Sequence, residues 1–496
     1  MTIRWGVSAM SHDAALAVFD GDRLVYASHG ERYSRVKNDR DLHPAQIAEA
    51  LAWGQPDEVF FYENHWAKRW RQLNAGQYRV AFKQTPASYL RGLGIRAPVH
   101  LAYHHESHAA YGAYTSGFDE ADIIVIDSIG EAETLTVWSY DSRRGMRQVA
   151  RQTYPDSVGL WYSAMTQRLG LKPQEHEYIL MGMAALGDPH RFYDMVRDDF
   201  IQSMPGRQSP KATFKQNLHR GCRDWRPEIV NIADYVDVAA AVQRIYEEIF
   251  EGILAWTSHR SPTDNVIIVG GCALNCVANV IAYKYYQRVW VPPNPGDAGS
   301  SVGAVLAYYP APLQLDHAYL GTDIAGSYPV TDVIADLHAT GVSAVAAGRA
   351  EFGPRALGHR SILADPRLPD VKDRVNAIKH REEFRPFAPM ILEEHADTYF
   401  QTPGPTWTAP YMQFAIPCRD PQAYPGIVHV DGTSRVQTVP KGNHGARALL
   451  EQWYAETGCP MLLNTSLNIK GEPLVNTRDD ADRWSAVHQL LVRMPR

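Results

Sequence analysis

The hydrophobic positions of the chain gather in short runs, which are typical of β-strands, and longer amphipathic stretches lie between them. The runs at Ile3–Ala9, Ala14–Phe19 and Arg23–Ser28 predict three strands, and Asp20-Gly21-Asp22 predicts a tight turn between the last two. Further strands are predicted at Ile123–Ile126, Val266–Val269, Val289–Val291 and Ser343–Ala347. Helices are predicted at Pro44–Trp53, His104–Tyr114, Leu160–Leu169 and Val238–Trp256.

Several of the predicted strands end in loops rich in glycine and aspartate. Strands separated by helices, with such loops on one side, predict an α/β fold around a cleft. The arrangement resembles the actin–hexokinase–Hsp70 class of ATP-binding folds, whose loops enclose a nucleotide and a metal. A change of composition at Leu313–Val342 predicts a boundary, so we expect domains at 1–340 and 341–496.

Composition narrows the class of protein. The 496 residues carry a net charge of −6, which argues against a general nucleic-acid binder but leaves room for a local basic patch. The five cysteines form no CxxC pair, so neither a disulfide framework nor a thiolate zinc site is expected. No signal peptide and no run of about 18 apolar residues is visible, and a cytoplasmic protein is expected.

Four residues predict a metal site. His104 and His108 are four positions apart on a predicted helix and therefore project from one face. Imidazole suits Fe, Zn, Mn or Co, although this spacing alone occurs as often in a core or surface pair. Asp127 and Asp297 each follow a predicted strand, and they would complete a set of two nitrogens and two carboxylates.

The segment Gly348–Pro366 places Arg349, Arg355 and Arg360 among glycines. Arginine presents a planar fork of donors to phosphate or carboxylate, and glycine lets backbone N–H groups approach the same anion, so we expect an anion site here. The alternative is a solvated basic loop. Walker A and nucleophile-elbow motifs are absent from the sequence, which excludes P-loop and serine-hydrolase chemistry.

Two further loops are candidates for the cleft. His12 and Asp13 follow the first strand, where a phosphate or a reacting group would lie, and Lys37 comes shortly after. Gly270 and Gly271 begin a segment that ends at Asn275 and could let a nucleotide approach the backbone. A solvated charged loop and a close-packed turn are the respective alternatives.

At these residues the chain resembles the NodU/TobZ family of O-carbamoyltransferases over nearly its whole length. The ordered motifs that carry the resemblance are His12-Asp13, Glu31-Arg32-Tyr33-Ser34-Arg35, His104–Ala110, Gly270–Asn275, Gly296–Gly299, Glu351–Leu357, Phe384–Pro389 and Leu463–Ser466. The resemblance implies a TsaD-like domain of the actin–Hsp70 class (ASKHA fold) followed by an α+β YrdC-like domain. It also implies a cytoplasmic enzyme that uses ATP and carbamoyl phosphate, with a homodimer as a further expectation.

The resemblance implies two steps. The YrdC-like domain would form carbamoyl-adenylate, and the TsaD-like domain would transfer the carbamoyl group to a hydroxyl beside Fe²⁺ or another divalent transition metal, with Mg²⁺ accompanying ATP. The resemblance implies that carbamoyl phosphate and ATP are bound by Arg355, Arg385, Arg435, Asn464 and Ser466, and that the metal is bound by His104, His108, Asp127 and Asp297. It implies that the catalytic residues are His12, Lys37 and Asp127. It implies that the nucleotide cleft is lined by Gly270, Gly271 and Asn275.

The acceptor is left open by the resemblance. Between Trp66 and Arg96 there are seven basic residues, no acidic residue and interleaved aromatics, which suits a polynucleotide. A 5-hydroxymethylcytosine in DNA is one candidate, and a small hydroxylated metabolite or sugar is the other. Threonylcarbamoyl transfer to tRNA and a non-catalytic nucleotide-binding regulator are the alternative functions. The residues expected to contact nucleic acid are Lys68, Arg69, Trp70, Arg71 and Arg79.

Overall fold

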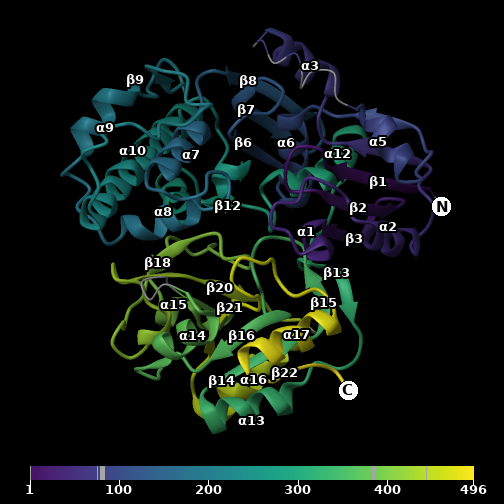
Figure 1. The fold of residues 1–496 in the computed structure, drawn as a ribbon, viewed down its shortest axis with the longest axis vertical. Coiled ribbons are helices and arrows are strands. Elements are labelled where there is room, and N and C mark those ends of the chain that lie inside the picture. Colours follow the sequence, from purple (N-terminus) through teal and green to yellow (C-terminus); the bar gives the residue numbers. More distant parts are fainter. Residues whose placement is uncertain (1, 75, 77, 79–83, 382–386, 443) are drawn as a thin grey trace. The chain divides into compact units, whose positions relative to one another are not determined.

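The computed structural model describes residues 2–74, 76, 78, 84–381, 387–442 and 444–496. The chain divides into two compact units (Figure 1). Met1–Val25 and Ala50–Leu315 form the first, and Tyr26–Glu49 and Asp316–Arg496 form the second. The units differ from the domain limits expected at 1–340 and 341–496, because an early segment of the chain belongs to the second unit. We call this segment, residues 26–49, the arm.

The first unit begins with a five-stranded sheet of order β3-β2-β1-β4-β5. The predicted hairpin is present, with Ile3 opposite Asp20 and Ser8 opposite Ala15, and β4 runs parallel to β1. The bounds are β1 Ile3–Ser8, β2 Ala15–Asp20, β3 Arg23–His29, β4 Glu58–Phe61 and β5 Val99–Leu101.

A second five-stranded sheet repeats this topology, with order β12-β11-β6-β7-β8. Again a central strand has an antiparallel hairpin on one side and two parallel strands on the other. The duplicated sheet confirms the predicted actin–Hsp70-like α/β class. The bounds are β6 Glu120–Ile126, β7 Glu133–Asp141, β8 Gly145–Thr153, β11 Asn265–Val269 and β12 Arg288–Trp290.

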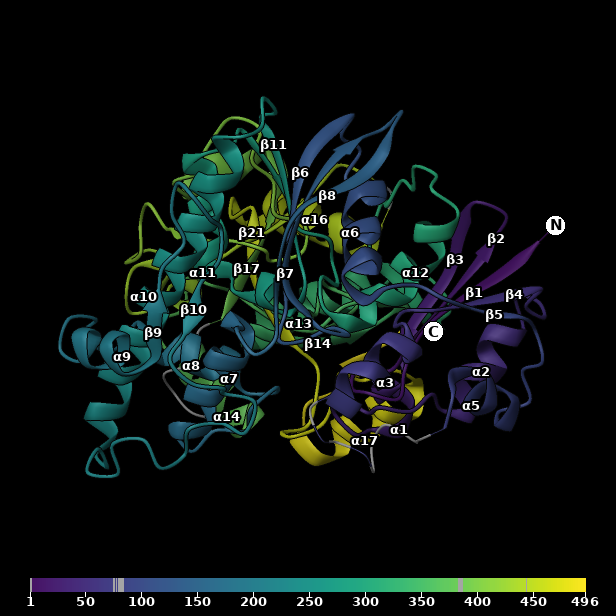
Figure 2. The ribbon, with the colours of Figure 1, turned by 90° about the horizontal axis from the view of Figure 1, so that it is seen from above.

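Two helices, α6 (His104–Thr115) and α12 (Ser300–Tyr308), lie between the sheets (Figure 2). Helix α12 packs on β1 of the first sheet, and α6 packs on β6 and β11 of the second. The helices approach so closely that a Cβ atom on Gly303 would lie 1.8 Å from the carbonyl oxygen of Ser107. Glycine is therefore required at position 303. In the sequence, α6 follows β5, the last strand of the first sheet, and α12 follows β12, the last strand of the second sheet. The helices therefore belong to the same repeat as the sheets.

Among the remaining helices of the first unit, α7, α8 and α9 pack against the long helix α10. Helix α10 has 27 residues and contains the predicted helix Val238–Trp256, and its apolar residues Val242, Ile245 and Ile249 are among those that are buried. No described helix is long and apolar enough to cross a membrane. The bounds are α3 His65–Asn74, α5 Pro86–Gly92, α7 Val158–Arg168, α8 Glu177–Ala184, α9 Tyr193–Phe200, β9 Ile201–Ser203, β10 Thr213–Phe214, α10 Ile232–Ser258 and α11 Cys276–Asn279.

Asp122 is a buried carboxyl in β6 that accepts a hydrogen bond from the hydroxyl of Tyr286 at 2.9 Å. Burial raises the pKa of Asp122 from 3.8 to about 6, although the hydrogen bond from Tyr286 acts to lower it. The native state therefore holds more protons than the unfolded chain between pH 3.8 and about 6. Across that window the free energy of unfolding falls as pH rises, by at most about 3 kcal/mol.

We therefore expect Asp122→Asn to unfold at a higher temperature than the parent protein at pH 7. The amide stays neutral and can still accept the hydrogen bond from Tyr286. The advantage should almost vanish near pH 3, below the ordinary pKa of 3.8, because Asp122 is then largely protonated in both states. Thermal unfolding at the two pH values checks this. A difference of the same size at both would contradict the assignment of the effect to the buried charge.

The second unit is built on a six-stranded sheet of order β20-β17-β21-β16-β14-β22. Helices α13 and α16 cover one face, and Val333, Leu363, Met390 and Trp453 are among the buried residues of that core. The predicted strand at Ser343–Ala347 is β14. The bounds are β13 Tyr319–Ile324, α13 Val330–Thr340, β14 Val342–Ala346, β15 Gly348–Glu351, β16 Arg360–Ala364, α14 Val371–Lys379, β17 Ala388–Leu392, α15 Ala396–Tyr399, β18 Ala415–Pro417, β19 Thr433–Arg435, β20 Gln437–Val439, α16 Gly445–Thr457, β21 Met461–Ser466, α17 Arg478–His488 and β22 Val492–Arg493.

The arm contains the last four residues of β3, all of α1 (Glu31–Ser34) and most of α2 (Pro44–Leu51), and polar contacts fasten it to the rest of the second unit. The hydroxyl of Tyr33 lies 2.9 Å from that of Thr322. Arg35 donates to the carbonyl oxygens of Pro473 and Leu474 at 2.8 and 2.7 Å. These partners come from two distant parts of the sequence, so the arm is an integral part of the second unit.

Candidate metal centre and anion site

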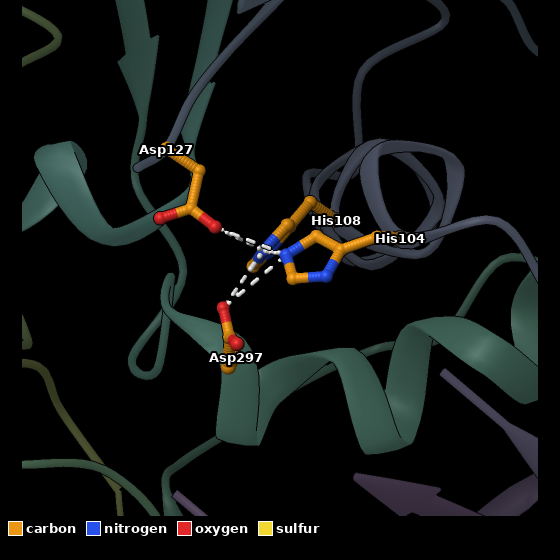
Figure 3. Close-up of side chains that lie close together, drawn as sticks. All are labelled: His104, His108, Asp127 and Asp297. Atoms are coloured by element: carbon orange, nitrogen blue, oxygen red, sulfur yellow. Dashed lines mark hydrogen bonds and ion pairs between the residues drawn. The ribbon is translucent and has the colours of Figure 1, made fainter. Parts of the chain in front are cut away.

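His104, His108, Asp127 and Asp297 converge at one point in the first unit (Figure 3). The histidines come from the first two turns of α6, Asp127 directly follows β6, and Asp297 begins the short 3-10 helix Asp297–Gly299 before α12. Nε2 of His104 lies 3.0 Å from Asp127 Oδ2 and 3.3 Å from Asp297 Oδ1. Nε2 of His108 lies 3.1 Å from Nε2 of His104 and 3.4 Å from Asp297 Oδ1.

This cluster suits a divalent metal. One ligand atom from each residue lies within 4.8 Å of every other, and all four residues are buried. The Oγ of Ser300 lies 3.2 Å from Nδ1 of His108, which orients the ring with Nε2 toward the cluster. A cation here would satisfy two carboxylates and two imidazole nitrogens that otherwise face one another.

The charges of the cluster are strongly coupled. Burial alone would raise the pKa of Asp297, but the imidazoles of His104 and His12 outweigh burial and hold it well below its usual range. Burial and the carboxylate of Asp297 also oppose ionisation of Asp127, yet hydrogen bonding to His104 lowers its pKa. Both carboxylates are therefore ionised at neutral pH, as metal ligands must be.

The structure brings His12 to the same point. It lies on the loop between β1 and β2, with Nε2 3.4 Å from Asp297 Oδ2 and Nδ1 3.0 Å from Asp13 Oδ2. Met10 and Asp13 have positive φ angles of 72° and 53°, so this loop holds a backbone shape that such residues seldom adopt. Burial lowers the pKa of His12, but Asp297 and Asp13 outweigh it and raise the pKa to about 10.

Glu131 is a buried residue of this site that sequence reasoning missed. Its Oε1 accepts hydrogen bonds from the backbone N–H groups of Asn64, at 2.6 Å, and His104, at 3.0 Å. It thereby joins the loop after β6, which carries Asp127, to the first residue of α6. Burial raises the pKa of Glu131 to about 7. In the sequence, its position four residues after Asp127 could have indicated that Glu131 lies near the site.

The loop after β11 packs against the metal centre. Gly270 has a φ of 91°, and a Cβ atom there would lie 2.3 Å from the carbonyl oxygen of Ile126. The N–H of Gly271 donates to Asp127 Oδ1 at 3.3 Å. Asn275 caps α11 and exchanges two hydrogen bonds with Gln243. These contacts give both glycines a packing role, and the nucleotide cleft at Gly270, Gly271 and Asn275 stays a prediction.

In the second unit, two arginines of Gly348–Pro366 do not serve the anion role expected of that segment. Arg360 is fully buried and donates to five backbone carbonyl groups, and Arg349 donates to the carbonyls of Leu320 and Gly321. Their donors are thus committed to the protein's own backbone. The five acceptors of Arg360 are Thr322, Ala347, Gly348, His359 and Asn476.

The other predicted anion ligands lie around that segment. Arg355 and Arg435 are half-buried, on the loop before β16 and at the end of β19. Asn464 is buried in β21 and donates to the carbonyl of Ala356 at 3.0 Å, next to Arg355. Ser466 Oγ lies 3.2 Å from Lys379 Nζ. Arg385 lies outside the described residues, so anion binding by this group stays a prediction.

Lys37 was predicted to act together with His12. It is half-buried in the arm and therefore belongs to the second unit, whereas His12 belongs to the first. Its catalytic role stays a prediction.

The predicted nucleic-acid segment contains helix α3, whose charges are partly internal. Lys68 pairs with Glu63 at 2.6 Å, Arg69 lies over the ring of Trp66 at 4.9 Å, and Arg71 is half-buried. Trp66 and Trp70, one turn apart, are 60% and 68% exposed. The exposed face of α3 is therefore mainly aromatic, and Arg79 lies outside the described residues.

The duplicated α/β unit thus carries a buried His/Asp cluster that could hold a metal ion. Two family models match the chain, Carbamoyltransferase N-terminus over residues 59–306 and Carbamoyltransferase C-terminus over residues 334–492. The chain belongs to the carbamoyltransferase family and is a carbamoyltransferase.

Similar proteins match along nearly the whole chain. Nodulation protein U of Rhizobium tropici is 32% identical over 96% of this chain and 93% of its own. Nodulation protein NolNO of Sinorhizobium fredii is 30% identical, over 95% of this chain and 76% of its own. Uncharacterized protein sll1178 of Synechocystis is 30% identical over 97% of this chain and 94% of its own. The similarity thus includes both units.

Proposed function

We propose that the chain is an ATP- and carbamoyl-phosphate-dependent O-carbamoyltransferase that works through carbamoyl-adenylate. The observation that carries the proposal is the convergence of His12 with the buried cluster His104, His108, Asp127 and Asp297, in a chain whose family transfers carbamoyl groups. A cytoplasmic location and a homodimer are parts of the same proposal.

The first step belongs to the second unit. Water releases inorganic phosphate from carbamoyl phosphate, and an oxygen of the resulting carbamate displaces pyrophosphate from the α-phosphorus of ATP. Both substrates are polyanions, and Mg²⁺ would accompany ATP. The half-buried Arg355 and Arg435 supply charge-assisted donors beside Asn464. Arg385 and Ser466 complete the proposed binding group.

The second step belongs to the first unit. The oxygen of an acceptor hydroxyl attacks the carbamoyl carbon, the bond to the AMP oxygen breaks, and AMP leaves with its electrons. A divalent transition metal such as Fe²⁺, held by the four clustered side chains, would polarise oxygen and lower the pKa of a hydroxyl beside it.

His12 would take the proton of the acceptor hydroxyl or stabilise the developing oxyanion. Asp13 accepts from Nδ1, which leaves Nε2 as the proton-accepting atom toward the cluster. A cation on Asp127 and Asp297 would offset two of the three carboxylates that raise the pKa of His12, so this pKa would fall from about 10 toward neutrality while Asp13 still raises it. Lys37 would stabilise negative charge in this step.

The acceptor is proposed to be either a small hydroxylated metabolite or sugar, or 5-hydroxymethylcytosine in DNA. Helix α3 has features that help to weigh the two candidate acceptors. Exposed Trp66 and Trp70 provide a stacking surface for bases or rings, whereas the internal pairing of Lys68 weakens the case for a polyanion. The two candidates therefore need a direct comparison.

The decisive experiment supplies the full chain with ATP, carbamoyl phosphate and each acceptor in turn. We expect AMP and pyrophosphate to form, with a mass gain of one carbamoyl group on the accepted hydroxyl. Formation of threonylcarbamoyl-tRNA would instead favour that alternative. An absence of nucleotide turnover with every acceptor would contradict the adenylate route.

If DNA is the acceptor, we expect replacement of both Trp66 and Trp70 by alanine to weaken its binding by about 1–3 kcal/mol per stacked base. The salt dependence should stay unchanged, because no charge is removed. Binding by fluorescence anisotropy at two salt concentrations measures both quantities. Unchanged affinity in the double variant would show that α3 does not bind DNA.

A further inference from the structure

The loop that carries Arg355, residues 353–360, is fastened by side chains from other segments at four of its eight backbone carbonyls. Arg32 donates to the carbonyl of Gly353 at 2.7 Å, and Tyr328 donates to that of Gly358 at 2.8 Å. Asn464 holds the carbonyl of Ala356, while Gln437 and Tyr319 both hold that of Leu357. A loop with this many fixed groups presents its side chains in one arrangement.

Glu351 fixes the N–H groups of the same loop. Its Oε1 accepts from the backbone N–H groups of Leu357 at 2.8 Å, His359 at 3.0 Å and Arg360 at 3.2 Å. Glu351 is 2% exposed, and its second carboxylate oxygen has no hydrogen-bond partner among the described residues. A buried carboxylate in such a place needs nearby positive charge.

Arg32 supplies part of that charge. Its side chain is 3% exposed, its Nε lies 3.6 Å from Glu31 Oε1, and its positive charge also acts on the carboxylate of Glu351. Burial lowers the pKa of Arg32, but the guanidinium remains charged because its ordinary pKa is so high. Arg32 and Gly353 are 321 positions apart, so the arm reaches this loop through tertiary contact.

We propose that Arg32, acting with Glu351, is a positioning residue for Arg355. Arg32 holds one end of the loop through Gly353, and Glu351 holds the other through three N–H groups. Neither residue is proposed to contact a substrate. The proposal rests on the proposed function for its kinetic consequence, since Arg355 is the anion ligand of the first step. It also explains why an Arg-containing motif lies in the arm.

The physical expectation is a loss of alignment. Arg32→Met keeps the length and the apolar stem of the side chain but removes both the charge and the donor to Gly353. The loop would gain freedom, and Arg355 would meet carbamoyl phosphate or ATP in fewer productive arrangements. Misplacement of a positioning group by about 1 Å can reduce turnover roughly 100-fold.

A matched control is Arg447→Met in the same unit. Arg447 is also 3% exposed, and it binds Glu394 and the carbonyl of Val439, not any group of residues 353–360. It therefore reports the general cost of removing a buried arginine from this unit. Arg32→Lys keeps the charge and one donor, and we expect it to recover part of the lost activity.

The kinetic test measures pyrophosphate release by the full chain with ATP and carbamoyl phosphate. We expect kcat/KM to fall about 100-fold in Arg32→Met and to recover in part in Arg32→Lys. Arg447→Met should lose stability without this kinetic loss. Unchanged kinetics in Arg32→Met, with an active parent protein, would overturn the positioning role.

A second test does not depend on the activity. Hydrogen exchange of peptides covering 353–360 should become faster in Arg32→Met and in Glu351→Gln, and it should stay unchanged in Arg447→Met. If the parent protein released no pyrophosphate, the proposed function would fail while this measurement still judged the bracing of the loop. Equal protection of the loop in all variants would overturn the inference.

Discussion

Replacing His108 by alanine is expected to abolish carbamoyl transfer while leaving pyrophosphate release intact. The side chain supplies one of the four converging ligand atoms, and Ser300 holds its ring in place. Loss of a ligand should reduce metal affinity and transfer by about 100-fold or more. Elemental analysis of the purified variant, together with separate assays of pyrophosphate and carbamoylated product, measures each effect.

His105 offers the matched control for this variant. It lies next in the same helix and is equally buried, but its Nδ1 lies 3.0 Å from Thr136 Oγ1, away from the cluster. Burial lowers its pKa to about 3, so it is neutral. His105→Gln should lose stability yet keep its metal. Equal metal content and equal transfer in the parent protein and His108→Ala would refute a metal role for the cluster.

The second large effect is expected for Arg355→Ala. Pyrophosphate release should fall by about 100-fold or more, since a charge-assisted donor to the reacting anions is lost from a braced loop. The folded structure should persist, because the backbone of residues 353–360 is held by other side chains. Pyrophosphate release and the thermal unfolding temperature would be measured on the same preparation.

Arg367→Ala is the control for Arg355→Ala. Arg367 follows the same segment, but its guanidinium is paired with Asp365 at 2.8 Å and about one third of its side chain is exposed. Its removal should leave pyrophosphate release unchanged. Normal release by Arg355→Ala would show that the carbamoyl phosphate and ATP site lies elsewhere in the chain.

The sequence predicted much of the architecture. The continuous apolar run Val266–Val269 appears as β11, because such a run needs burial on both faces of a sheet. Ile3–Ala9 appears as β1, and its alternation of apolar with small or polar residues is the other pattern typical of a strand. The duplication of the two sheets was not visible in the sequence, since many different apolar residues can fill equivalent strand positions. The contacts between the arm and the rest of the second unit could not be predicted, because nothing in a local pattern reveals a partner 321 positions away.

Some residues of the candidate site could likewise be predicted from the sequence, and others could not. His104, His108, Asp127 and Asp297 could be grouped because helix spacing and strand ends are local features that sequence displays. Arg360 could not be separated from Arg355 in that way. Both are arginines set beside glycines, and only the folded structure reveals that the donors of Arg360 are used by backbone carbonyls. Glu131 and Glu351 escaped notice because their partners are N–H groups, which every sequence has.

The two repeated sheets each contribute residues to the candidate metal centre. The loop with His12 joins the first two strands of one repeat, and Asp127 lies on the corresponding loop of the other. Likewise, the histidines open α6 and Asp297 precedes α12, the corresponding helix. Neither half carries a complete set of ligands. A complete set of ligands therefore requires both repeats folded together.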